Sequence, residues 1–418
     1  MSYIVRSRKF ICISKFCNLF RIYCDLQASL SEGNERLALI NRAREVFPDF
    51  VRFPNLLPEV AALENVTECY FAQHLLACFH YSRRNYEKAT HLWHRCVEMA
   101  PDFADAWRGL AIHAWNKQGD AELAAEYLDK ACTHQPEDAR LLFERDLLDK
   151  LTAVEPEKRL ARLEANLATA LKRDDLTAEL LHLWHLAGNT EQAANVLASR
   201  KFHPWEGGEG KVTSQFVINQ LLRAWPYLQP QPQQAETLLL SALRYPENLS
   251  EGRLPGQTDN DIWFWLGICA RQQGMEERAL ECFRKAASGD RTINIHSYYN
   301  DQPVDYLFWQ GVALRMLGDR LSSERLFTEM LQWAEHMETA QIEADFFAVS
   351  QPDLLALYAD IQKQHQEKCL LVRVLASAGL GGGSRHEQAL SALEALNPAW
   401  AKAALFRKTL PFVLHLIN

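Results

Sequence analysis

Two histidine pairs have the spacing that metal binding requires. His91 and His94 enclose Leu-Trp, as do His182 and His185, so each pair is expected on one face of a helix. Zinc needs further ligands, and no carboxylate or cysteine stands at motif spacing beside either pair. Each central tryptophan also fits the core of a helical hairpin. We therefore predict no metal site and no cofactor.

A glycine-rich loop offers a second kind of chemistry. Between His203 and Gly210, the side chains of Trp205, Glu206 and Glu209 combine an aromatic surface with two carboxylates on a pliable backbone. Such a loop can bind a carbohydrate or an electropositive surface, or it can be an exposed turn that Trp205 anchors. Two carboxylates three residues apart are poorly placed to flank a glycosidic bond. Without a nucleophile elbow, H-E-x-x-H or P-loop sequence, we predict no enzyme.

The composition restricts the partners further. A formal net charge of −8 opposes nucleic-acid binding, which depends on clustered Lys and Arg. The ten cysteines form no C-x-x-C pair, which favours reduced residues in a cytoplasmic protein. No apolar run reaches the roughly eighteen residues of a membrane span. We expect neither nucleic acid nor a membrane as a partner.

The elements that must position these residues follow a helical-hairpin pattern. Gly267 and Ala279 are small enough for two helices to approach at their crossing, and Phe283 fills the space beside them. This spacing resembles the tetratricopeptide repeat (TPR). Such a hairpin cannot bury its apolar face alone, so the fold class is predicted as an all-α, right-handed superhelical solenoid of TPR-like helix-turn-helix hairpins. The pattern consists of Trp263, Leu266, Gly267, Ala270, Gly274, Ala279, Phe283 and Ala286.

Prolines mark the boundaries of the repeats. Pro48-Asp49-Phe50 and Pro101-Asp102-Phe103 end two units in the same way, and Pro136 follows Pro101 by 35 residues, so one residue has been added near the turn between them. We expect a basic segment or partial helix at 1–24, a TPR-like array at 25–200, a glycine-rich loop with an irregular hairpin at 201–258, and a second array at 259–418. A capping helix, at about 400–410, is expected to end that array.

Four aspartates stand near the expected starts of first helices. A carboxylate there can cap free N–H groups and meet the positive end of the helix dipole. We therefore interpret these side chains as structural caps and not as catalytic acids. They are Asp105, Asp175, Asp261 and Asp305.

The hairpins that begin near residues 261 and 305 share several side chains on their first helices, in addition to the residues of the repeat pattern. These shared side chains are expected to point away from the second helix and to line a concave groove. An arginine beside an aromatic face suits a peptide with acidic and apolar residues, or a flat sugar face. The alternative is that the aromatic side chains pack against the inserted loops. The matched positions are Phe264 with Phe308, Ile268 with Val312, and Arg271 with Arg315.

The loop from Phe202 to Val212, placed between TPR units, also carries a family resemblance. It resembles the C-terminal half of large bacterial proteins that place a domain of unknown function, similar to sugar-mutarotase β-sandwiches, before a TPR array. The resemblance covers about Leu37 to the C-terminus and implies an origin near carbohydrate metabolism. The sequence has no counterpart of the β-rich part, so if catalysis belongs to that part, we expect none here.

The sequence as a whole predicts a cytoplasmic, non-catalytic interaction scaffold. Its concave TPR groove is expected to bind a protein partner, a peptide or a companion carbohydrate-handling domain. The alternative function is a carbohydrate-binding or carbohydrate-active accessory module that uses the loop around Trp205.

Overall fold

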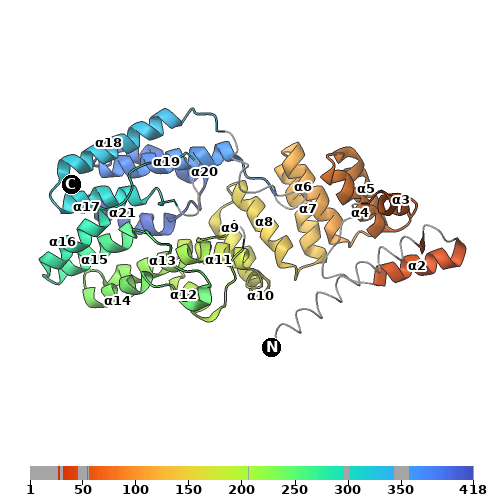
Figure 1. Ribbon diagram of the computed structural model, residues 1–418, viewed down its shortest axis with the longest axis horizontal. Coiled ribbons are helices and arrows are strands. Elements are labelled where there is room, and N and C mark those ends of the chain that lie inside the picture. The colour runs from red at the N-terminus through yellow and green to blue at the C-terminus, as the bar shows by residue number, and fades with distance from the viewer. Residues whose placement is uncertain are drawn as a thin grey trace. The chain divides into compact units, whose positions relative to one another are not determined.

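The described part of the chain is helical. The computed structural model describes residues 27–28, 32–45, 54, 56–205, 207–295, 301–342 and 357–417, and no strand occurs among them (Figure 1). The expected all-α fold is confirmed. The helices up to the middle of the chain are α2 (Gly33–Glu45), α3 (Leu57–Glu64), α4 (Tyr70–Ser82), α5 (Tyr86–Met99), α6 (Ala104–His113), η1 (Ala114–Gln118), α7 (Ala121–His134), α8 (Ala139–Leu151), α9 (Pro156–Ala165), α10 (Leu167–Ala170), α11 (Asp174–Ala187) and α12 (Thr190–Ser199).

The second half continues in the same way. Neighbouring helices pair as hairpins, and each hairpin also packs on the next, as α14 does on α15 and α16 on α17. The remaining helices are α13 (Lys211–Ala224), η2 (Trp225–Tyr227), α14 (Pro232–Ala242), η3 (Glu247–Leu249), α15 (Asn260–Gln272), α16 (Glu276–Ala286), α17 (Tyr306–Met316), α18 (Arg320–Met337), α19 (Ile361–Gly379), α20 (Ser384–Leu396) and α21 (Ala403–Ile417).

The described residues form two compact units. Unit 1 contains those up to Leu148 together with Leu357 and Tyr358, and unit 2 contains the rest. The division falls within α8. The glycine-rich loop belongs to unit 2, where the Phe202 amide donates to the Asn248 carbonyl (2.8 Å) and the Ser250 hydroxyl donates to the Phe202 carbonyl (2.7 Å).

Several expectations concern residues outside the described part. They include the partial helix at 1–24 and the repeat boundary at Pro48-Asp49-Phe50. Among the helices that the structure does describe, none combines the length and apolar character needed to cross a bilayer.

The hairpin of α15 and α16 shows why small residues are needed at the crossing. A Cβ atom added to Gly267 would lie 2.5 Å from the nearest ring carbon of Phe283, which is fully buried. Ala279 is fully buried as well. The close approach of the two helices therefore depends on the absence of a side chain at position 267.

Replacing Gly267 with alanine is expected to lower the free energy of unfolding, because the buried ring of Phe283 has to move. Overpacking of this kind costs about 1–3 kcal/mol, and the higher helix propensity of alanine offsets up to about 1 kcal/mol. Urea denaturation followed by circular dichroism measures the change. Gly252→Ala is the matched control, because a Cβ atom there meets no atom within 4 Å. Equal stability of the two variants would contradict the packing argument.

The added residue between Pro101 and Pro136 is found at the end of a first helix. There α6 continues into η1, a π-helical turn in which the Gly119 amide donates to the Ala114 carbonyl. A π-turn takes up one extra residue without breaking the helix. The following helix, α7, then begins normally after the turn at Gly119.

Candidate functional site

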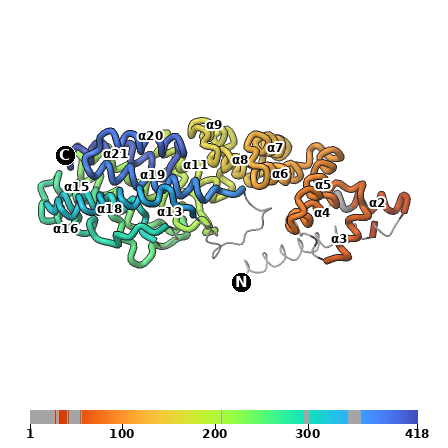
Figure 2. The backbone as a smooth tube through the Cα atoms, turned by 90° about the horizontal axis from the view of Figure 1, so that it is seen from above, coloured from red at the N-terminus to blue at the C-terminus, as the bar shows by residue number. Residues whose placement is uncertain are grey.

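In unit 2, the first helix of each of several hairpins packs against the C-terminal helix. Helix α21 contacts α11, α13, α17 and α19, and Figure 1 shows it inside the arc that the first helices form. Figure 2, turned by 90°, shows α21 beside α19. Leu405 and Val413 on α21 are fully buried. The chain thus fills this groove itself, and the helix expected to cap the end of the array lies across its first helices instead.

Aromatic contacts between the groove and α21 show which side chains face it. The Trp309 ring stacks on Phe406 of α21 (centroids 5.7 Å apart), and Trp265 lies 6.1 Å from Phe412. Phe264 instead lies 5.9 Å from Phe283 of its own second helix. Of the two neighbouring aromatic side chains, Trp265 is therefore the one that contacts α21. The match between Trp265 and Trp309 in the two hairpins is the sequence signal for this pair.

The other predicted groove side chains are buried too. Phe308 and Val312 are fully buried and Ile268 is 4% exposed. Phe308 lies 6.0 Å from Phe327 on its own second helix and 5.9 Å from Phe406. These side chains pack against helices, and a partner can reach them only if α21 leaves.

The two matched arginines have different environments. Arg315 donates to the carbonyls of Ile417 (2.8 Å) and Gly379 (2.9 Å), so it caps the C-terminal ends of α21 and α19. Burial lowers the pKa of Arg315. Arg271 is bound to Glu276 on the adjacent second helix (2.8 Å) and keeps 37% of its side chain exposed. The match in sequence therefore does not extend to a shared role.

A buried ionic cluster fixes the start of α21. The Lys402 ammonium lies 3.1 Å from Asp261 and 2.6 Å from Asp305, at the N-terminal ends of α15 and α17. Burial lowers the pKa of Lys402, but the two carboxylates outweigh this effect and hold it above its usual range. Burial raises the pKa of Asp305, and the nearby Asp261 carboxylate raises it further, because one ammonium offsets only one of the two negative charges.

This cluster corrects the interpretation of the four aspartates as caps. Asp305 precedes α17, but its carboxylate accepts no bond from the helix amides and binds Lys402. Asp261 accepts from the amide of Ile262 (2.9 Å) as well as from Lys402. A basic side chain also binds each of the other two, since Arg140 donates to Asp105 (3.0 Å) and Arg173 to Asp175 (2.6 Å).

The second histidine pair is buried and hydrogen-bonded. The imidazole of His182 donates from Nε2 to the Ala399 carbonyl (2.9 Å). Nδ1 of His185 donates to Gln215 (2.9 Å), and its Nε2 accepts from the amide of Asn219 (3.1 Å). Burial lowers the pKa of His182 to about 4 and that of His185 to about 3. Both rings are therefore neutral at pH 7 and are engaged within the protein.

The glycine-rich loop folds its aromatic side chain onto its own backbone. A Cβ atom added to Gly208 would fall within the indole ring of Trp205, so the ring covers that glycine directly. His203 has 69% of its side chain exposed, and Glu209 is exposed as well. Glu206 lies outside the described residues. One face of the Trp205 indole is thus used inside the loop.

In unit 1 the first helices are joined by a buried ion pair. Arg108 on α6 donates to Glu144 on α8 at 2.6 and 2.7 Å, and the two side chains are 8% and 6% exposed. Next to it, Arg140 keeps 41% of its side chain exposed while it binds Asp105. The first helices of unit 1 are therefore joined by a buried ion pair, and an accessible basic side chain lies on the same helix α8.

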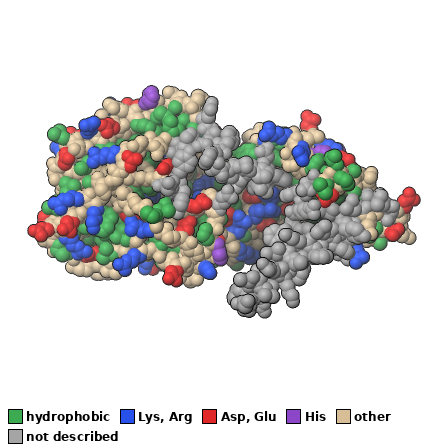
Figure 3. All heavy atoms as spheres, in the orientation of Figure 1, with side chains coloured by type: hydrophobic (Ala, Val, Ile, Leu, Met, Phe, Trp, Pro, Cys, Tyr) green, Lys and Arg blue, Asp and Glu red, His purple; other side chains and the backbone are tan. Residues whose placement is uncertain are grey.

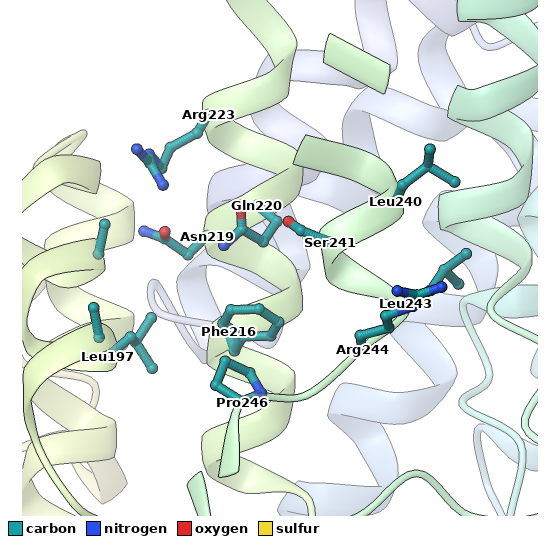
Figure 4. Close-up of a pocket in the computed structure, with 12 residues that line it drawn as sticks. Leu197, Phe216, Asn219, Gln220, Arg223, Leu240, Ser241, Leu243, Arg244 and Pro246 are labelled. Carbon is teal, nitrogen blue, oxygen red and sulfur yellow. The ribbon is translucent and has the colours of Figure 1, made fainter. Parts of the chain in front are cut away.

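A cleft of about 670 Å³ opens between α12, α13 and α14 (Figure 4). Its floor includes Leu197 and Phe216, and Arg223 and Arg244 stand at its sides. The Asn219 amide nitrogen is bound by the fold, but its oxygen is buried without a partner. None of the side chains predicted to bind a ligand lines this cleft.

The arrangement defines the chain as an all-helical protein of stacked hairpins. Residues 74–140 and again residues 261–291 match the tetratricopeptide repeat family. These matches cover α4 to α7 in unit 1 and the hairpin of α15 and α16 in unit 2. The chain therefore contains tetratricopeptide repeats, as its sequence pattern predicts.

Solved structures give weaker likenesses. A chain in the structure of Naa15/Naa10 bound to HypK-THB is 13% identical with a TM-score of 0.37, and the match covers 84% of this chain and 58% of that one. A chain of the APC/C hetero-tetramer Cut9-Hcn1 is 11% identical with a TM-score of 0.25, covering 91% and 76%. This chain thus spans little more than half the length of the first. Likenesses at this level carry no argument about function, and the resemblance to bacterial proteins with a mutarotase-like domain stays a prediction.

Proposed function

We propose that this chain is a cytoplasmic, non-catalytic scaffold that binds a protein partner on the first-helix face of unit 1. The observation that carries the proposal is the position of α21. Because α21 fills the groove of unit 2 with buried side chains, the partner is placed instead on the first helices of unit 1, where the Arg140 side chain on α8 is 41% exposed. TPR arrays bind through such faces because each hairpin adds its first helix to a continuous surface.

The charge on that face favours a partner segment with acidic residues. Arg140 stands partly exposed beside the buried pair of Arg108 and Glu144. A carboxylate from a partner can compete there with Asp105 for the guanidinium group. Elsewhere, on the face of unit 2 in Figure 3, acidic and basic side chains are interspersed, which does not resemble the basic stripe of a nucleic-acid binder.

Affinity capture followed by reconstitution tests this function. A protein captured by the full chain is purified, and its binding is measured by isothermal titration calorimetry with cross-links mapped by mass spectrometry. We expect cross-links on α4, α6 and α8, and at least about tenfold weaker binding by Arg140→Glu, which corresponds to about 1.4 kcal/mol. Arg325→Glu on α18, whose side chain is 81% exposed, is the matched control and should change the affinity less than about twofold.

The rival function as a carbohydrate module is tested on the same protein. Glycan binding that is lost in Trp205→Ala, or turnover of a sugar substrate that is lost in Glu209→Gln, would replace the scaffold proposal if no protein partner can be reconstituted. A partner whose cross-links fall on α15 and α17 would also overturn the assignment to unit 1. In that case α21 must leave its groove when the partner binds.

A further inference from the structure

The turn η1 holds a short segment without regular secondary structure from a distant part of the chain. The Tyr358 amide donates to the side-chain oxygen of Asn116 (2.8 Å), and the Trp115 indole N–H donates to the Tyr358 carbonyl (2.8 Å). Both backbone groups of one residue are therefore bound by two consecutive side chains of η1. Leu357, the residue before it, is only 5% exposed.

This geometry selects an extended backbone. In a helix the N–H and C=O groups of a residue are used by the helix itself, so only a segment outside regular structure can offer both to side chains. The two hydrogen bonds make no use of the Tyr358 side chain. They bind a peptide through its backbone and leave selectivity to the positions of Leu357 and Tyr358.

Side chains around η1 supply that selectivity. The Lys117 ammonium lies 5.5 Å from the ring centre of Tyr358 and 4.7 Å from that of Tyr86, so it stands between two aromatic faces. A cation placed in this way favours an aromatic residue in the peptide. The burial of Leu357 favours an apolar residue immediately before it. The contact thus fits an apolar residue followed by a tyrosine.

The helix has an irregular turn at this point. The added residue of the hairpin forms the π-turn Ala114–Gln118, which carries Trp115, Asn116 and Lys117. A π-turn costs stability relative to a regular helix and often occurs where side chains have a function. The insertion and the bound segment are independent observations, one from the spacing of the repeat and one from the contacts, and they fall on the same three residues.

We propose that η1 is a capture site for an extended peptide of a protein partner, with an apolar residue followed by tyrosine, and that Leu357 and Tyr358 occupy this site in cis. The proposal rests on the proposed function and names the kind of segment that the scaffold binds. A segment in the same chain competes at an effective concentration in the millimolar range, so the cis contact raises the affinity that a partner needs. The partner segment must therefore replace Leu357 and Tyr358.

A labelled synthetic peptide tests the site without an identified partner. The peptide carries residues 353–362, and its binding to the full chain is followed by fluorescence anisotropy. In the double variant Leu357→Asp/Tyr358→Ser the cis residues no longer fit, and we expect at least about tenfold tighter peptide binding than to the wild type. Adding Trp115→Phe, which keeps a ring but removes the indole donor, should weaken the peptide about three- to tenfold. Adding Asn116→Ala should do the same.

Controls separate capture from misfolding. Circular dichroism and thermal melting must show that each variant folds, and Arg325→Ala in the double variant should leave the affinity unchanged. A peptide with Asp and Ser in place of the leucine and tyrosine should not bind.

Equal peptide binding by the wild type and the double variant, or no effect of Trp115→Phe and Asn116→Ala, would overturn the proposal. A dimer of the wild type that the double variant abolishes would overturn the cis contact, because the segment then reaches a second copy. Failure of the peptide to bind leaves the reconstituted partner at Arg140 unaffected, so the two proposals fail separately.

Discussion

Phe406→Ala is expected to lower the free energy of unfolding of unit 2 by about 3–5 kcal/mol. The Phe406 ring stacks between Trp309 (5.7 Å) and Trp400 (5.8 Å) and is 2% exposed. Removing it leaves a cavity that these large rings cannot close, and the cost of such cavities adds to the lost transfer of the ring from water. A loss of this size is a large part of the total stability of most domains.

Chemical denaturation measures this loss, and hydrogen exchange locates it. Exchange should rise in peptides from α15, α17 and α21, because α21 is the element that their aromatic side chains cover. Lys408→Ala, an exposed position on the same helix, is the matched control and should change stability by less than about 0.5 kcal/mol. If Phe406→Ala were as stable as Lys408→Ala, α21 would not be part of the core, and the groove of unit 2 would be open to partners.

The second large effect is expected for Lys402→Met. Methionine keeps the length of the side chain but leaves Asp261 and Asp305 buried without their cation; their side chains are 0% and 9% exposed. Breaking a buried ion pair from one side typically costs about 3–5 kcal/mol, because the remaining charge is neither solvated nor paired. Urea denaturation at pH 7 should show this loss, and Lys408→Met should not.

A charge-neutral variant checks the cause of that loss. Adding Asp261→Asn and Asp305→Asn to Lys402→Met removes both carboxylates and should recover more than half of the lost stability. No recovery would mean that the loss does not come from the two unpaired carboxylates. The cluster would then be a packing feature of the start of α21.

Alkaline pH should act on the same cluster. The pKa of Lys402 is raised in the folded protein, so its contribution is fully present below the unfolded lysine value of about 10.4 and is lost as the pH rises through the folded value. The wild type should therefore lose its stability advantage over Lys402→Met above about pH 10.4. A constant difference between the two proteins across this range would contradict the assignment.

Both effects concern how α21 is held, and they bear on function. A groove that is closed by a core helix cannot bind a partner in the way that the matched side chains of the two hairpins suggest. The proposed function therefore places the partner surface on unit 1, where Arg140 is accessible and η1 binds the backbone of Tyr358. Stability measurements on unit 2 test whether α21 closes the groove, and binding measurements on unit 1 test whether the partner binds there.

The sequence by itself determined the hairpins and the type of repeat. Gly267, Ala279 and Phe283 lie within one hairpin, so the steric reason for their sizes can be read over a short stretch of chain. The same holds for the added residue before Pro136, which changes a repeat length and leaves a visible offset. The absence of strands from the described residues follows from the same periodicity.

Only the tertiary structure decided what covers the groove. A C-terminal stretch with an apolar stripe shows that it buries a face, but the stripe is the same whether that face meets the end of an array or its groove. Lys402 lies 141 residues from Asp261, and Tyr358 lies 242 residues from Asn116. Contacts over such separations leave no periodic pattern in the sequence, because neither partner constrains the residues next to the other. For the same reason the sequence does not show whether Phe264 or Trp265 contacts α21: a helix position gives the direction of a side chain only after the neighbouring helices are in place.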